Sequence, residues 1–429
     1  SDWQDLYSIA KKYYEALLAD PGNAQFHLTD PRGASDKSGR TFNNPYQYFF
    51  EQMHMDDAIY ADESIYEYPM QQGGGNDGRP YSFGRPSSGG SKAAYPCKSY
   101  GQGRINPAYF YGVFDPNDMR RDVSITMTGS NGKGVEKLIP FVPNSKAEGG
   151  GLTLNKWDEN RQANPWVAAQ RKSGINGPYM RMSEVYLGYA EVCAALGDVV
   201  TGKQYLKTVR ERSFPQGLAN TDAFIASFGN DLVRAIIEER GFEYAGEGDR
   251  RWTLIRSGYL PEDIKRIKDM TKAMMDGLAT KGYYEFENGN IISAYIWTKL
   301  VDAKTIYGHR LTAQCPTDKV NDPVLYPGWR GQKDNWEEMG LNYGSSTPAT
   351  NLAIKGLFEI VSEEEAASLE SQGYAKVNWG IDLVDYRDEY DKYLFWDYDY
   401  VSAPIYLWPF TPNVMAAGGF TNGYGFKQE

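Results

Sequence analysis

The residue types that perform acid–base and metal chemistry occur in this chain, but their spacing forms no catalytic signature. The histidines are His27, His54 and His309, and no two lie four residues apart, the spacing that places two zinc ligands on one helix face. The chain has no GxSxG nucleophile motif. We therefore expect each histidine to be a hydrogen-bonded or surface residue, and we expect neither a metal centre nor catalytic residues.

Two glycine-rich stretches resemble phosphate-binding loops only in part. Residues 129–134 (GSNGKG) have the wrong spacing for a P-loop and lack a flanking strand and helix. Residues 101–106 (GQGRIN) have the first two glycines of a dinucleotide-binding fingerprint but not the third. We interpret the second stretch as a turn.

Carboxylates are abundant, with 56 Asp and Glu residues in the chain. A glycoside hydrolase needs two of them roughly 5–10 Å apart across a cleft, and that separation is a property of the tertiary structure. The acidic and aromatic segment 382–400 offers Asp397 and Asp399 as Ca²⁺ ligands, but it lacks the spacing of an EF-hand. We favour a solvated face for this segment and expect no cofactor, with Ca²⁺ as the alternative.

Aromatic side chains in glycine-rich loops are the best candidates for ligand binding. The chain has 33 Tyr and 10 Trp, and these rings suit positions that are apolar on one side and wet on the other. Residues 70–104 and 143–165 are rich in Gly, Ser and Pro, and long loops of this kind are either functional or disordered. The alternative is that the rings seal loops against the core. The predicted stacking residues are Tyr81, Phe83, Tyr95, Tyr100, Trp157 and Trp166, with Asn76, Asp77 and Arg79 as polar contacts.

The overall composition argues against several classes of partner and site. The net charge of −11, without a basic run, disfavours a nucleic-acid partner. No apolar run reaches the roughly 20 residues needed to cross a bilayer. Because Cys97, Cys193 and Cys315 lie far apart, we expect neither a disulfide scaffold nor a zinc site.

Hydrophobic periodicity predicts a mostly helical fold with little strand. The first predicted helix carries an apolar stripe that it cannot bury alone, and Gly197 is placed as a C-terminal cap of the second. Beyond residue 285 the periodicity is broken, so loops are expected to dominate. The predicted helices are residues 3–18, 178–196, 222–246 and 260–278, and the predicted strands are residues 123–127 and 295–297.

Three separated motifs match one family, SusD/RagB. The first resembles the family's R-x-x-E-x-x-L-x-x-A-E helix through Arg181, Glu184, Leu187, Ala190 and Glu191. The second resembles its E-R-x-x-E-x-x-x-E-G-x-R-x-x-x-L-x-R segment through Glu239, Arg240, Glu243, Glu247, Gly248, Arg250, Leu254 and Arg256. The third is similar to the closing segment of the family through Tyr406, Leu407, Pro409 and Pro412, although Asn422-Gly423-Tyr424 stands where Asn-Pro-Gly-Tyr is usual. A shorter similarity covers residues 116–125 (PNDMRRDVSI).

The resemblance implies tetratricopeptide-like helix pairs joined to a large, loop-rich and irregular ligand-binding part. The implied organisation is one domain over residues 1–429 that lacks its N-terminal repeats. Within it, residues 1–60 would be a helical repeat segment, residues 61–175 the ligand face and residues 176–429 the C-terminal scaffold. The resemblance also implies a position at the cell surface, on the outer membrane through a lipid anchor absent from this chain. The partner would be a SusC-like TonB-dependent transporter.

The charged residues of the motifs are expected to act as scaffold. Arg181 and Glu184 lie three apart, and Glu239 and Glu243 lie four apart with Arg240 between them. Charges so spaced can form ion pairs that join two helices, because a planar guanidinium satisfies carboxylates bidentately. We therefore expect this set, together with Glu191, Glu247, Arg250 and Arg256, to hold the fold and not to contact ligand.

Four functions follow from these patterns. The leading prediction is capture of oligosaccharides for import by the transporter, without catalysis. The alternative within the same family is capture of peptides, in which main-chain hydrogen bonds would dominate. A glycoside hydrolase on a helical scaffold would require two facing carboxylates. A purely structural role, as a transporter lid or a fimbria-like subunit, would require no ligand pocket.

Overall fold

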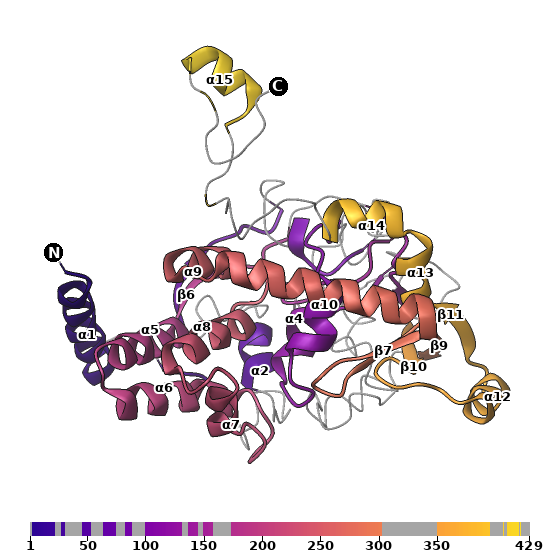
Figure 1. Ribbon diagram of the computed structural model, residues 1–429, viewed down its shortest axis with the longest axis horizontal. Coiled ribbons are helices and arrows are strands. Elements are labelled where there is room, and N and C mark those ends of the chain that lie inside the picture. The colour runs from indigo at the N-terminus through magenta and orange to yellow at the C-terminus, as the bar shows by residue number, and fades with distance from the viewer. Residues whose placement is uncertain are drawn as a thin grey trace.

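The computed structural model describes residues 2–21, 27–30, 45–52, 63–73, 82–87, 99–130, 136–144, 149–157, 173–302, 350–394, 406, 410–419 and 421. The helices of residues 3–19 and 182–243 lie at one end of the molecule, the strands of residues 283–302 and 350–378 lie toward the other, and the long helix α10 (Leu260–Lys281) runs between them (Figure 1). The prediction of a mostly helical fold with little strand is confirmed.

The helices of the described residues are α1 (Trp3–Ala19), α2 (Pro45–Gln52), η2 (Tyr109–Val113), α4 (Arg120–Ser124), α5 (Met182–Ala195), α6 (Val199–Arg212), α7 (Thr221–Ala226), α8 (Leu232–Glu243), α9 (Arg250–Ser257), α10 (Leu260–Lys281), α12 (Glu363–Ser371), α13 (Gly380–Asp385), α14 (Arg387–Leu394) and α15 (Pro412–Gly418). The strands are β1 (Ser64–Tyr68), β2 (Ile125–Thr126), β3 (Thr128–Ser130), β4 (Glu136–Leu138), β5 (Thr153–Leu154), β6 (Gly177–Arg181), β7 (Tyr283–Glu285), β8 (Ile291–Ser293), β9 (Tyr295–Asp302), β10 (Thr350–Lys355) and β11 (Ala375–Asn378).

Helices α5 and α6 form a hairpin, with α1 packed against α5 and α8 in contact with both (Figure 1). The hairpin turns at Gly197, whose φ of +89° suits glycine, and Asp198 then caps α6 by accepting a hydrogen bond from the Thr201 amide at 3.2 Å. The sequence analysis predicted both α1 and the role of Gly197, and both are confirmed. The repeat-like character of this end therefore comes from short connections between amphipathic helices.

Helix α1 has two apolar sides. Tyr7, Ala10, Tyr14 and Leu18 pack against a small cluster on α5 that includes the buried Cys193. The opposite side leaves Leu6, Ile9 and Tyr13 exposed by 56%, 54% and 70%. The amphipathic pattern thus predicts where the helix lies in the sequence. Only one of its two apolar sides is covered by described residues.

The predicted helix over 178–196 is wrong in its first turn. Residues 177–181 form β6, which pairs antiparallel with β1, and α5 begins only at Met182. Arg181 is therefore the extended residue before the helix (φ −130°, ψ 160°) and does not share a helix with Glu184. Pairing with a strand more than a hundred residues away overrides the local helical pattern.

The predicted continuous helix over 222–246 is also wrong, because it divides into α7 and α8. Gly229 and Asn230 both have φ of 65°, a left-handed conformation that stops a helix. Asp231 then caps α8 by accepting from the Arg234 amide at 2.9 Å. Among the described residues beyond 285, strands β8–β11 and helices α12–α14 are found where loops were expected to dominate.

The remaining predictions are borne out with altered bounds. The helix expected at 260–278 is confirmed as α10, which continues to Lys281 and ends at Gly282 with φ of 78°. The strand expected at 295–297 is the start of β9. The strand expected at 123–127 is wrong for Val123 and Ser124, which end α4, and only Ile125 and Thr126 form β2.

The largest core cluster lies where α10 meets the small sheets. It contains the side chains of η2, β8 and β10 together with Phe141 and Trp379. The ring centroids of Phe141 and Trp379 are 4.3 Å apart, and the Trp379 indole donates a hydrogen bond to the Tyr111 hydroxyl at 2.8 Å. A second cluster fills the space between α5, α6, α7 and α8. These two cores hold the charged cluster described next between them.

Candidate functional site

A buried cluster of ion pairs centres on Glu243 at the end of α8. Its carboxylate lies 2.7 Å from Arg181, 2.7 Å from Arg212 and 3.1 Å from Arg120. Burial alone would raise the pKa of Glu243, but the charges of Arg212, Arg181 and Arg120 outweigh it and hold the pKa well below its usual range. Glu243 is therefore a permanent anion that holds three guanidiniums in place.

The same cluster ties the loop-rich segment to the helices. Arg181 reaches Glu63, which directly precedes β1, at 2.9 Å, and Glu63 also pairs with Arg212 of α6. On the other side Glu247 accepts from Arg181 at 2.9 Å and pairs with Lys156 at 2.6 Å. Burial lowers the pKa of Lys156 to about 8 despite the nearby carboxylate of Glu247. The cluster thus fastens both strands of the β1–β6 pair to α6 and α8.

The other charged residues of the motifs form further ion pairs around this centre. Arg240 pairs with Glu184 and with Asp249, both at 2.7 Å. Arg256 donates to Glu191 at 2.7 Å. The remaining pairs are Arg250 with Glu238 and Asp263, each at 2.9 Å, and Glu239 with Arg120 at 2.7 Å and Arg210 at 2.9 Å.

This arrangement limits the chemistry of the motif carboxylates. A general acid must reach the substrate with a group free to donate a proton, whereas each of these carboxylates is engaged in an ion pair with an arginine of the scaffold. They are therefore suited to fastening elements together and not to proton transfer. Among the described residues there is also no group of three or more His, Cys, Asp or Glu side chains placed to hold a metal ion.

An exposed aromatic surface lies directly above the buried cluster, on β1 and β6. Tyr66 and Tyr68 of β1 are exposed by 56% and 55%, and Tyr179 of β6 is exposed by 70%. The rings of Tyr66 and Tyr179 have centroids 5.8 Å apart and an interplanar angle of 87°, so they form the floor and wall of a corner. We call these three residues the tyrosine ledge.

The opposite face of the same strand pair explains why the ledge points outward. Ser64 and Glu67 are buried, and Ser64 stands opposite Arg181 in the register. The Glu67 carboxylate accepts from the Asn176 amide at 2.9 Å, and the Asn176 carbonyl oxygen accepts from the Met70 backbone amide at 2.8 Å. Polar and charged groups thus anchor one face, and the tyrosines occupy the other.

The predicted stacking residues lie in different surroundings. Phe83 is 46% exposed and packs near the backbone of Gly103, and Tyr100 is half-buried. Trp157 is only 1% exposed and packs with Leu154 and Ile175, so its burial gives no support to a stacking role. Tyr81, Tyr95, Trp166, Asn76, Asp77 and Arg79 lie outside the described residues, as do Asp397 and Asp399.

The tyrosine ledge was not among the predicted site residues. The nearest signals in the sequence are the tyrosines at the alternate positions 66 and 68, whose spacing suits one face of a strand, and Tyr179 two residues before Arg181. Neither signal shows that the two segments pair, because pairing is decided by tertiary structure.

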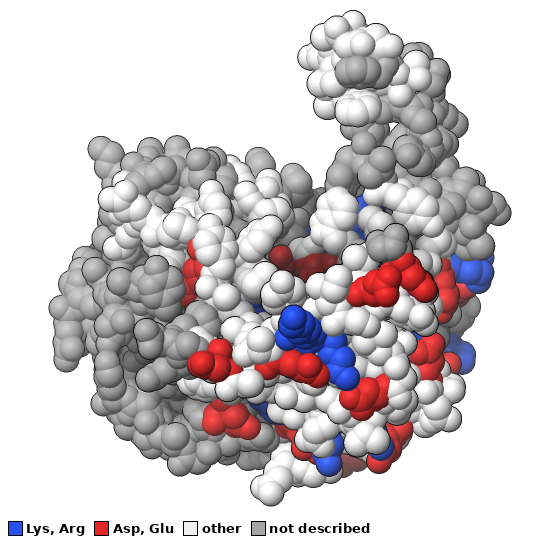
Figure 2. Space-filling model, turned by 90° about the vertical axis from the view of Figure 1, so that its left-hand side faces the viewer, with Lys and Arg blue, Asp and Glu red and all other residues white. Residues whose placement is uncertain are grey.

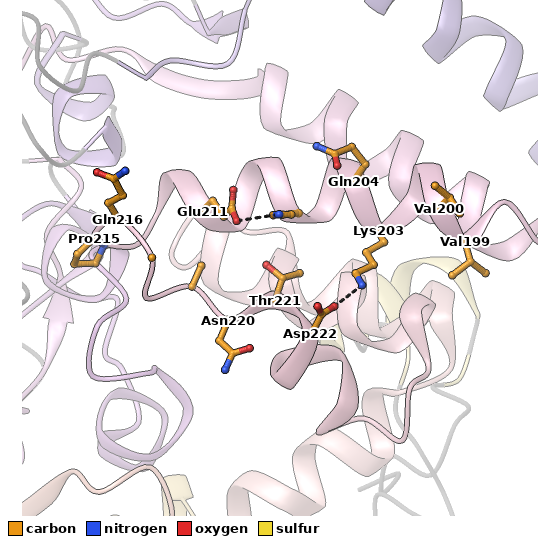
Figure 3. Close-up of a pocket in the computed structure, with 13 residues that line it drawn as sticks. Val199, Val200, Lys203, Gln204, Glu211, Pro215, Gln216, Asn220, Thr221 and Asp222 are labelled. Atoms are coloured by element: carbon orange, nitrogen blue, oxygen red, sulfur yellow. Dashed lines mark ion pairs between the residues drawn. The ribbon is translucent and has the colours of Figure 1, made fainter.

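A large cavity among the described residues is a different kind of site. It has a volume of about 1130 Å³ and lies between α6 and residues 215–222, where Lys203 reaches across to Asp222 (Figure 3). Val199 and Val200 lie at one end, and no aromatic side chain lines it. It therefore offers no ring for stacking. On the face shown in Figure 2, acidic and basic side chains are interspersed without a large basic patch.

Comparisons with known proteins connect this scaffold to one family. The model of the SusD family matches residues 25–410. The SusD-like protein P25 of Formosa agariphila is 28% identical over 160 residues, which are 37% of this chain and 26% of that protein. No helix in the described part of this chain is long and apolar enough to cross a membrane.

Solved structures give more distant similarities. Surface glycan-binding protein A of Bacteroides uniformis is 21% identical with a TM-score of 0.39, over 60% of this chain and 46% of that one. Surface glycan-binding protein A of Bacteroides thetaiotaomicron, solved in complex with laminarihexaose, is 19% identical with a TM-score of 0.38, over 60% and 52%. The chain thus spans about a quarter of the curated relative and about half of these two proteins. Because the family model matches most of its length, the chain belongs to the SusD family.

Proposed function

We propose that this protein captures an oligosaccharide on the tyrosine ledge and releases it unchanged. The observation that carries the proposal is the corner formed by Tyr66 and Tyr179, two rings at 87° that are both more than half exposed. Sugars present flat C–H faces that pack on such rings, while their hydroxyls bond to polar groups and water at the rim. A corner can hold one sugar ring flat on one tyrosine and bracketed by the other.

The absence of catalysis is part of the proposal. It is supported by the motif carboxylates, because Glu184, Glu191 and Glu247 are each paired with an arginine. A hydrolase would instead need two opposed carboxyl groups with different protonation states.

We propose the cellular setting of this protein on the basis of its family. In this setting the chain is anchored by lipid on the outer membrane, at the cell surface, and delivers its ligand to a SusC-like TonB-dependent transporter. Residues 61–175 would supply most of the ligand face and residues 176–429 the scaffold, with Tyr179 as the scaffold's contribution to the ledge. Residues 1–60 would belong to the repeat part.

Peptide capture remains the second candidate, and one observation favours it. Strands β1 and β6 form a sheet of two strands in the described part of the chain, so each strand has an outer edge. An extended peptide can add to such an edge through main-chain hydrogen bonds. Binding of this kind would depend much less on the tyrosine rings than sugar stacking would.

The experiment combines a glycan array and a peptide array with calorimetry on the best ligand. We expect an oligosaccharide to bind, and we expect Tyr179→Ala and Tyr66→Ala each to weaken its binding roughly thirtyfold or more, because truncating a central ring costs about 2 kcal/mol or more. The matched control is Tyr13→Ala on α1, since Tyr13 and Tyr179 are both 70% exposed. Equal affinity of Tyr179→Ala, Tyr66→Ala and Tyr13→Ala would reject the ledge, and binding of peptides alone would favour the second candidate.

A further inference from the structure

A second cleft lies away from the ledge, on another side of the ion-pair cluster. It has a volume of about 790 Å³ and is enclosed by α7, α8, the start of α10, residues 112–118 and the turn after β7. This volume falls in the range of about 300–1,000 Å³ that is usual for small-molecule sites. One wall is aromatic, because Phe224 and Phe228 line the cleft with their rings 5.2 Å apart in an edge-to-face arrangement.

The basic side chains of this cleft are already paired. Arg210 binds Glu239 at 2.9 Å, Arg234 binds Glu238 at 3.0 Å, and Arg266 binds Asp263 at 2.6 Å. These ion pairs neutralise the arginines that line the cleft. A ligand carboxylate or phosphate would therefore have to displace a protein carboxylate to reach one of them.

Two acidic side chains that line the cleft have no ion pair of this kind. Asp115 and Glu287 line the cleft, and neither makes an ion pair with any other described residue. Their segments are fastened to each other, because the side-chain amide of Asn288 donates to the Phe114 carbonyl oxygen at 2.7 Å and to that of Tyr111 at 2.9 Å. The cleft thus presents hydrogen-bond acceptors with negative charge, which repel anions and favour groups that donate protons.

A donor without a partner lies in the same lining. The buried Nη1 of Arg234 has no hydrogen-bond acceptor, although its Nη2 is paired and its guanidinium lies 3.9 Å from the centre of the Tyr259 ring. An orphan buried donor is unfavourable, and because this atom is buried, a ligand oxygen would reach it only after the Arg234 side chain shifts. A hydroxyl group fits this site because it can donate to Asp115 or Glu287 and can also accept from an arginine.

We propose that this cleft is a second binding site, for one or two sugar units that are uncharged or carry an amine. The aromatic wall takes the C–H face of the sugar, the carboxylates of Asp115 and Glu287 accept from its hydroxyl or ammonium groups, and acidic sugars are excluded by charge. This site is independent of the proposed tyrosine ledge.

The test uses the full chain with Tyr66→Ala and Tyr179→Ala combined, so that binding at the ledge does not contribute. Maltose, glucosamine, glucuronic acid and lysine amide are titrated by calorimetry and by ligand-observed NMR. We expect saturable binding of maltose or glucosamine and at least tenfold weaker binding of glucuronic acid. Absence of saturable binding for both maltose and glucosamine overturns the proposal, and so does binding of lysine amide and glucosamine without any neutral sugar.

Variants then locate the site. Phe228→Ala is expected to weaken the binding of maltose at least fivefold. Glu287→Gln is expected to weaken the binding of glucosamine and to reduce the difference in affinity between glucosamine and glucuronic acid. The matched control is Glu285→Gln, an exposed residue two positions before Glu287 that does not line the cleft. Unchanged affinities in both cleft variants, with melting temperatures like that of the parent, would contradict the proposal. Loss of oligosaccharide binding at the ledge is measured separately, so either proposal can fail alone.

Discussion

Arg181 at the end of β6 and Glu243 at the end of α8 approach to 2.7 Å, although 62 residues separate them in the chain. Both side chains are buried, and Arg181 also reaches Glu63 beside β1. The pair therefore connects the strands that carry the tyrosine ledge to the helical part of the protein. Loss of this ion pair is expected to lower the stability of the fold and to disturb the position of the tyrosine ledge.

The first prediction concerns that pair. Arg181→Met is expected to lower the free energy of unfolding by about 3–5 kcal/mol, because Glu243 and its neighbouring carboxylates would lose a buried cation. Urea denaturation followed by circular dichroism measures the change. The control is Lys265→Gln, which removes an exposed ion pair with Asp269 on α10 and should change stability very little. Similar small losses in both variants would show that the buried cluster does not hold the fold.

The second prediction concerns acid. The pKa of Glu243 and that of Asp263 are lowered in the folded protein by neighbouring arginines, which outweigh the effect of burial. Their contribution to stability is therefore complete above the pKa of a carboxyl group in the unfolded chain, about 4, and is lost as the pH falls toward the folded values. We expect the free energy of unfolding to decrease below about pH 4.5. In Glu243→Gln this dependence should be shallower, and an identical slope would contradict the assignment.

The third prediction concerns alkaline pH and Lys156. Burial lowers the pKa of Lys156 to about 8 in the folded protein, so between this value and the usual value near 10.5 the unfolded chain binds more protons. Stability of the wild type relative to Lys156→Met should therefore rise as the pH increases from 8 to 9.5, by at most about 1.4 kcal/mol per pH unit. Parallel pH profiles of the two proteins would show that Lys156 does not titrate in this way.

The fourth prediction concerns the contact between α1 and α5. A Cβ atom at Gly188 would lie 2.7 Å from Cζ of Tyr14, so α1 packs directly over this glycine. Gly188→Leu is expected to cost about 1–3 kcal/mol and to loosen α1, which limited proteolysis would detect as faster cleavage near the N-terminus. Adding Tyr14→Ala makes room and should recover part of the loss. If the stability changes of Gly188→Leu and Tyr14→Ala simply add in the double variant, the strain does not arise from the contact between these two residues.

Local patterns were sufficient for the elements whose stability is decided nearby. The apolar stripe of residues 3–18 and the periodicity of 260–278 predicted α1 and α10, and Gly197 predicted the end of α5, because a glycine with positive φ stops a helix irrespective of its tertiary contacts. The charged motifs identified the family for a related reason, since their residue types and order are visible in the chain itself.

Long-range pairing decided the rest. Nothing near Met180 or Tyr66 in the sequence shows that these residues face each other across β1 and β6, because a strand pair is selected by what each face buries. The ion pairs of Arg181 with Glu63, Glu243 and Glu247 likewise arise only when a strand end, two helices and a loop converge. Residue types and order in the chain thus determined the family, the helices α1 and α10, and most of α5. Only the tertiary structure decided which tyrosines are exposed, because exposure depends on which face of a paired strand the buried charges occupy.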